Sequence, residues 1–327
     1  MNRSSAFVRS PFYPATVLAL ILTATAGLFV GSYTTFLAAP APHHIPLAVL
    51  APAGADRSLD ETLDALLDGA LEQQAMPDRT AARQAILEQR VFGVLEYRAT
   101  GIPARLELSG ASGPSVAQLL SERAPRAAVA SGTAVEIDDL SPLQEGDPRG
   151  LAIFYMTLAA VIIGFIGSML YDVHAPRLAP GERIGFLAVT ATSGGLAITA
   201  VVSLLVGALD LPFLSSWLIL SLTMFAAAVT CTMFSTLFGR WGMLPTWAVM
   251  VLLGNPSSGG TVSAALLPTT LGDLGRWLPP GASISAHHTA VYFPGHQSAF
   301  PYLVLTGWVV ASCVVFWRLR HRHPGGR

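Results

Sequence analysis

Six stretches of this chain contain no Asp, Glu or Arg, and this feature limits the fold more than any other. A helix of about 20 apolar residues crosses the hydrocarbon core of a bilayer, and a charge at its centre costs a few kcal/mol. We therefore predict six membrane spans. They cover Ala15–Ala39, 150–171, 184–209, Leu214–Gly239, the shorter Trp241–Gly254, and Phe300–Trp317.

Charge divides the chain into three parts. Only 12% of the residues are charged, about half the share in a soluble domain, and most of the 20 acidic residues lie between positions 38 and 149. The predicted fold is a polytopic α-helical membrane protein with a small α/β domain inserted between spans one and two. Its parts are residues 1–39 with the first span, residues 40–149, and a five-span domain over 150–327 with a short basic tail.

The arginines predict the orientation. If the N-terminus is cytoplasmic, the short loops on the far side carry only Arg276. The positive-inside rule then places both termini in the cytoplasm and residues 40–149 outside it, in the cell membrane. The arginines on the cytoplasmic side are Arg3, Arg9, Arg177, Arg183, Arg240, Arg318, Arg320, Arg322 and Arg327.

The first span has a second interpretation. A cleaved signal peptide would also begin with a basic segment and end at small residues such as 38–41. The apolar run from Ala15 exceeds the ~7–15 residues of a typical signal peptide, which favours an uncleaved anchor.

The polar insert has the pattern of an α/β unit. Leucines at 59, 63, 66, 67 and 71 recur at helical spacing, and Asp78 is placed to cap a second helix over 78–87. A third helix is predicted over Ser115–Val129. The predicted strands are Ile45–Leu50, Val91–Tyr97, Ala104–Leu108 and Thr133–Ile137.

The fifth apolar run is interrupted by a turn-forming segment. Trp241–Gly254 would rise only about 21 Å as a helix, short of the ~30 Å core. We predict a structural break there, with Leu266–Leu278 returning as a re-entrant or interfacial helix; an ordinary loop after a tilted span is the alternative. The residues of the break are Asn255, Pro256, Ser257, Ser258, Gly259 and Gly260.

Together these patterns resemble the membrane subunit of ABC-2-type exporters, closest to the phage-infection-protein branch. Three stretches carry the resemblance: Ile45–Leu50 after span one, Thr80–Ile86 followed by Val91–Leu95, and the break with Leu266–Pro268 downstream. Ala51–Gly54 stands where the family has a short acidic turn, and the arm of about 14 residues before span one is shorter than the family's interface helix.

The resemblance implies a homodimeric permease driven by a separate ABC ATPase. The chain has no Lys and therefore no phosphate-binding Gly-x-x-x-x-Gly-Lys loop, so ATP hydrolysis would come from the partner. The expected contact for that ATPase is the loop at 172–183 with the region around 240. The residues expected there are Asp172, Arg177, Glu182, Arg183 and Arg240.

No pattern of catalytic or metal-ligating residues stands out. His43–His44 and His287–His288 are adjacent pairs, expected in loops, and no His-Glu-x-x-His is present. We predict no enzyme activity, no catalytic, cofactor or metal site, and no nucleic-acid partner.

Two functions follow as expectations. The first is a permease-like subunit exporting an apolar or amphipathic substrate, because the predicted spans are uncharged. The second is a non-transporting membrane scaffold or receptor that binds a partner through the inserted domain. The substrate and the direction of transport are not encoded in any motif.

Overall fold

The computed structural model describes residues 12–37, 41–98 and 102–322, so the arm with Arg3 and Arg9, Arg327 and most of the small-residue segment 38–41 lie outside the described residues. Within these ranges five helices are long and apolar enough to cross a membrane, which is the architecture of a membrane protein. They are α2 (Phe12–Leu37), α6 (Ala152–His174), α7 (Pro180–Ala200), α8 (Phe213–Phe238) and α12 (Phe300–Arg322).

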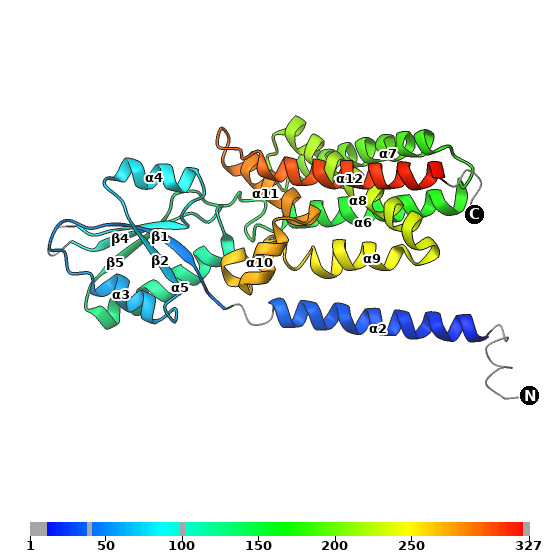
Figure 1. Cartoon of the computed structure of the whole chain (residues 1–327). Helices are drawn as coiled ribbons and strands as arrows, with labels where there is room; N and C mark the ends of the chain where they lie inside the picture. Colours follow the sequence, from blue (N-terminus) through cyan, green and yellow to red (C-terminus); the bar gives the residue numbers. More distant parts are fainter. Residues whose placement is uncertain (1–11, 38–40, 99–101, 323–327) are drawn as a thin grey trace, which may run out of the picture.

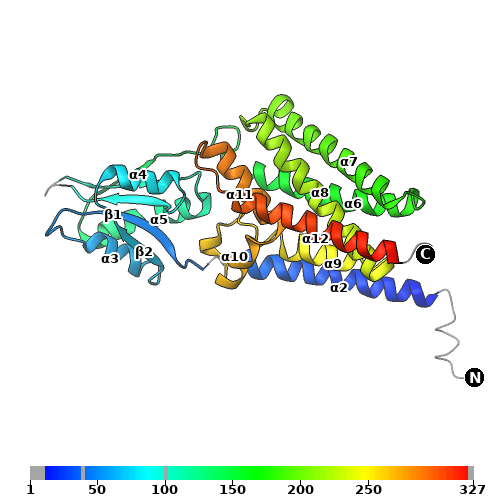
Figure 2. The same cartoon turned by 45° about the horizontal axis from the view of Figure 1, so that its top comes forward.

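Helix α8 forms the centre of the bundle, and α6, α7 and α12 pack around it (Figures 1 and 2). Small residues allow the close approach. A Cβ on Gly164 of α6 would overlap the carbonyl oxygen of Met224, and one on Gly195 of α7 would lie 2.7 Å from the Ser221 nitrogen. Gly207 ends the π-helical turn η1 (Val201–Val206) with a φ of 64°, a left-handed conformation that glycine adopts readily.

The fifth predicted span is short, as expected, and is not among the five long helices. It consists of α9 (Met243–Trp247) and the π-helical η3 (Ala248–Leu253), whose 5 and 6 residues rise only about 16 Å. The chain then turns through the break into η4 (Ala264–Leu266) and α10 (Thr269–Gly275).

Helix α11 (Pro279–Tyr292) was not predicted. It follows α10 as a largely buried helix of 14 residues and packs against α12, α8 and α6. The prediction that His287–His288 lies in a loop is wrong, because both residues are in α11. The helix begins with Pro279 and Pro280, which fit the first helical turn since it needs no amide donors.

Residues 45–139 form the α/β domain, built on a sheet in the order β2-β1-β3-β4-β5. β1 is parallel to β2 and β3, β4 is antiparallel to β3, and β5 is parallel to β4. The strands are β1 (Ile45–Leu50), β2 (Leu71–Ala75), β3 (Gly93–Glu96), β4 (Ala104–Leu108) and β5 (Val135–Asp139).

Side chains of β1 alternate between two buried layers. Leu47 and Val49 join the core with α3 (Ser58–Ala65) and α5 (Pro114–Ser131), whereas Ala48 faces α4 (Arg79–Leu87) on the other side. As predicted, Asp78 caps α4: its carboxylate accepts a hydrogen bond from the Ala81 nitrogen at 2.7 Å.

The helical spacing of leucines predicted one helix through Leu71, and this is wrong at its end. α3 stops at Ala65, and Asp68 and Gly69 then take positive φ values of 56° and 77°. Leu71 instead opens the edge strand β2, held in place because its nitrogen donates to the Asp64 carboxylate at 2.9 Å.

The α/β domain lies at one end of the bundle (Figure 1). The Phe12 end of α2, the turn between α6 and α7, and the Arg322 end of α12 lie at the opposite end. α2 runs beside η3, where the Tyr33 hydroxyl lies 3.5 Å from the Val251 carbonyl oxygen, and is otherwise the least buried of the long helices.

Candidate functional site at the junction of the domain and the bundle

The break is a buried, hydrogen-bonded turn. Asn255 and Ser257 are 1% and 2% exposed. The Ser257 hydroxyl donates to the Leu253 carbonyl and the Ser258 hydroxyl to the Asn255 carbonyl, both at 2.6 Å. The same two carbonyls also accept the backbone nitrogens of Ser257 and Ser258 at 3.2 Å each, so the turn is hydrogen-bonded within itself, as a buried environment requires.

The break packs directly against α10 and the start of α11. A Cβ on Gly275 would overlap the carbonyl oxygen of Ser257, and Gly254 comes close enough to Pro280 that a Cβ would lie 2.8 Å from its ring. Only glycine permits backbones to approach this closely. The three segments therefore form one tightly packed unit within the bundle.

The chain that follows the break packs into the α/β domain. The Ser263 nitrogen donates to the Ser115 hydroxyl at 2.9 Å, and the two hydroxyls are 3.0 Å apart. The His43 nitrogen donates to the Ala265 carbonyl at 2.9 Å. Leu266, 4% exposed, belongs to the core that α3 and α5 form on the sheet. The broken segment thus links the bundle to the domain.

Two further contacts hold the domain to the bundle. The Gln144 side chain pairs with the backbone of Asp210 in both directions, accepting from its nitrogen at 2.6 Å and donating to its oxygen at 3.2 Å. Gln89 donates to the Thr289 hydroxyl on α11 at 3.1 Å. These two side chains connect the turn after α4 and the linker 140–151 to α11 and to the connection before α8.

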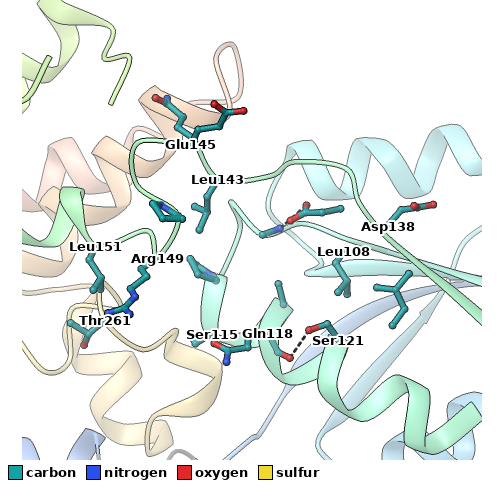
Figure 3. Close-up of a pocket in the computed structure, with 17 residues that line it drawn as sticks. Leu108, Ser115, Gln118, Ser121, Asp138, Leu143, Glu145, Arg149, Leu151 and Thr261 are labelled. Atoms are coloured by element: carbon teal, nitrogen blue, oxygen red, sulfur yellow. Dashed lines mark hydrogen bonds between the residues drawn. The ribbon is translucent and has the colours of Figure 1, made fainter. Parts of the chain in front are cut away.

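A cavity of about 790 Å³ lies at this junction (Figure 3). It is bordered by the first turns of α5, the end of β5, the linker 140–151 and Thr261, which directly follows the break. Its polar walls are formed by Ser115, Gln118, Ser121, Asp138, Asp139, Gln144, Glu145, Arg149 and Thr261.

Two of the acidic side chains of the cavity have hydrogen-bond or ion-pair partners, whereas its arginine has no ion-pair partner among the described residues. Asp138 pairs with Arg105 at 2.8 Å, and Asp139 accepts from the Gly110 and Ser141 nitrogens at 3.0 Å each. Arg149 forms no ion pair with any described residue, and its guanidinium points toward Thr261 (Figure 3). The cavity can therefore offer a cation and several hydroxyls to a polar ligand.

The histidines are dispersed. His44 bonds to Glu72 at 2.5 Å at the edge of the sheet, while His287 is fully buried in α11 with Nδ1 3.3 Å from the Ser283 oxygen. The described residues contain no group of three His, Cys, Asp or Glu side chains that could hold a metal ion.

The loop expected to contact an ATPase lies at the end of the bundle opposite the domain. Arg183 is buried there, paired with Asp172 at 2.5 Å and donating to the Ser168 oxygen at 3.3 Å. Glu182 accepts from the Ala179 nitrogen at 2.8 Å. Arg177 and Arg240 are exposed, the latter 5.2 Å from the centre of the Trp241 ring.

The break at 255–260 and the loop residues expected to contact an ATPase therefore lie at opposite ends of the bundle. The break lies beside the domain, where it joins residues that the sequence reasoning did not single out, above all Ser115 and Arg149. A faint signal existed for Arg149, since it is the last cation of the polar insert and adjoins a span. Nothing in the sequence indicated that Ser115 and Ser263 meet across 148 positions.

No protein-family model matches this chain, and no curated protein matches it.

Proposed function

We propose that the chain is the membrane, permease-like subunit of an ABC-2-type exporter, paired with a second copy and driven by a separate ATPase, for an apolar or amphipathic substrate. One observation carries the proposal: the segment after the break is built into the core of the α/β domain. A displacement of the broken segment within the bundle is therefore passed to the domain, as a transport cycle requires.

The distribution of charge supports the orientation in this proposal. Exposed Arg177 lies in the turn between α6 and α7, Arg240 just after α8, and Arg318 near the end of α12; these helix ends lie away from the α/β domain (Figure 1). The positive-inside rule assigns that end to the cytoplasm, and the domain then lies outside the cell membrane. The ATPase would bind at Arg177 and Arg240, because Arg183 is already paired inside the bundle.

The test is co-purification from the native membrane. The full-length chain, solubilised in mild detergent, should carry an ATPase that hydrolyses ATP in the eluate. The double charge reversal Arg177→Glu and Arg240→Glu should remove that activity, because it turns an attractive contact into a repulsive one. Arg126→Glu, at an exposed site on the domain, is the matched control and should retain it. ATP hydrolysis that is absent from the wild-type eluate would refute the exporter proposal.

The second function, a scaffold or receptor, is favoured by the junction cavity with its unpaired Arg149. A partner held there should be lost from the purified protein when Arg149 is replaced by Glu, with no ATPase in the wild-type eluate. An eluate with ATPase activity that is insensitive to Arg149→Glu would exclude this alternative.

A further inference from the structure

An apolar groove of about 570 Å³ lies on the outside of the bundle, between α12 and the connection from α10 to α11. Its lining is entirely apolar or aromatic apart from the Trp indole nitrogens. The residues are Trp277, Phe300, Leu303, Val304, Gly307, Trp308 and Ala311. Leu303 and Trp277 are 68% and 53% exposed, so the groove is open to the surrounding medium.

The walls of the groove are held in place before anything binds. The Trp308 indole nitrogen donates to the Trp277 carbonyl at 2.9 Å, which joins α12 to the α10–α11 connection. The Trp277 ring meets the Phe300 ring edge to face, with centroids 4.9 Å apart. A preformed apolar site binds an apolar chain without first ordering its own side chains.

The position of the groove fixes its depth in the bilayer. α12 is about 34 Å long, and the groove covers its first half, from Phe300 to Ala311. This half lies at the end of the bundle next to the α/β domain (Figure 1). The groove therefore faces the acyl chains of the leaflet on the domain's side, and its Trp pair lies toward the interface where indoles concentrate.

The side chain of Arg276 lies beside the groove. Arg276 directly precedes Trp277, is exposed, and lies 5.9 Å from the centre of the Trp277 ring. It forms no ion pair with any described acid, including Asp273 in α10, the helix that ends just before it. An arginine at the membrane interface extends its guanidinium toward phosphate groups, which it binds in a bidentate manner.

We infer that this groove binds one anionic phospholipid, with an acyl chain along α12 and the headgroup phosphate on Arg276. The apolar wall would hold the acyl chain. Arg276 favours a headgroup of net negative charge over a zwitterionic one, because the choline of phosphatidylcholine would add a second cation beside the guanidinium. The inference does not depend on transport or on an ATPase, so it stands or falls separately from the proposed function.

Gly307 gives a sharp test because a side chain can be added there. A Cβ at this position would meet no atom within 4 Å, so Gly307→Leu fills the groove and also improves helix propensity. Gly167→Leu, on α6, has the same open surroundings and lies outside the groove, which makes it the matched control. Arg276→Gln removes the charge and leaves the apolar wall unchanged.

The full chain is purified, delipidated, and titrated with phosphatidylglycerol or phosphatidylcholine in native mass spectrometry. The first phosphatidylglycerol should bind about fivefold more tightly than phosphatidylcholine, the effect of one interfacial arginine. Arg276→Gln should abolish this preference. Gly307→Leu should weaken binding of the first lipid at least fivefold, whereas Gly167→Leu should match the wild type. Melting temperatures of all three variants verify that they are folded.

Two results would overturn the inference. One is equal binding of the two lipids by the wild type, which would remove the assigned role of Arg276. The other is a folded Gly307→Leu protein that binds phosphatidylglycerol as tightly as the wild type, which would show that the lipid lies elsewhere.

Discussion

Arg183 and Asp172 form an ion pair where α6 ends and α7 begins. The ion pair closes the turn between α6 and α7, and the Ser168 carbonyl takes a further donor from the guanidinium. The Arg183 side chain is 5% exposed and that of Asp172 is 37% exposed, so loss of Asp172 would leave a buried guanidinium without its carboxylate, whereas Asp172 keeps contact with solvent. The pair therefore serves the geometry of this turn and leaves Arg177 as the exposed cation of the loop.

At the same scale, Tyr97 links stability to pH. Its hydroxyl donates to the carboxylate of Asp60, which is 0% exposed, and accepts from the Asp60 nitrogen at 3.0 Å. Burial, and then the hydrogen bond to Asp60, raises the pKa of Tyr97 above its ordinary value. The folded state therefore holds the phenolic proton more tightly than the unfolded state, in which the pKa is about 10.

The stabilising contribution is complete below pH ~10 and is lost as the pH rises above it. We expect the melting temperature of the full chain in detergent to fall as the pH rises above about 10, and Tyr97→Phe to flatten that fall. Tyr97→Phe should also cost about 1–2 kcal/mol at pH 8, because the Asp60 carboxylate loses a donor. Tyr155→Phe, at an exposed tyrosine of α6, should melt like the wild type. Equal slopes for wild type and Tyr97→Phe would contradict this account.

At the scale of elements, the packing of α10 against the break requires a glycine at position 275. Gly275→Ala would place a methyl group on the Ser257 carbonyl, so α10 must move away from the turn. We expect a loss of about 1–3 kcal/mol in the free energy of unfolding, the usual cost of overpacking. Gly185→Ala, where a Cβ meets nothing within 4 Å, should be neutral or slightly stabilising. Thermal unfolding in one detergent compares them; identical curves would mean that α10 is not locked to the break.

Elements with a local signal were predictable, and those that depend on distant contacts were not. Uncharged length identified the five long helices, and Asp78 identified the start of α4. Leu71 has the spacing of the α3 leucines but follows a turn through positive φ values, which spacing does not reveal. α11 has no apolar stripe and is rich in small and hydroxyl residues, since it is covered by helices that the sequence does not identify as its neighbours.

The same division applies to the candidate site. The composition of the break predicted a turn, and the structure contains one. The cavity beside it could not be predicted, because its walls come from α5, β5, the linker and Thr261. The helix packing that assembles these walls is determined by the whole chain.

For the whole molecule, the proposed orientation makes a prediction about access. Val129 is 86% exposed on the α/β domain, and Arg177 is exposed at the other end of the bundle. In intact cells, a membrane-impermeant maleimide should label Val129→Cys and should label Arg177→Cys only after permeabilisation. The native Cys231 is buried and Cys313 half-buried, so unsubstituted protein measures the background. The reverse pattern would place the domain in the cytoplasm.

The insertion of Leu266 into the core of the α/β domain has a consequence for biosynthesis. The strands and helices of the domain end at Asp139, but a residue of its core is made only after α6, α7, α8 and α9. Until these helices have been synthesised, the core of the domain lacks Leu266. The complete core can therefore form only after α6, α7 and α8 have left the ribosome, in contrast to domains that fold as soon as they emerge.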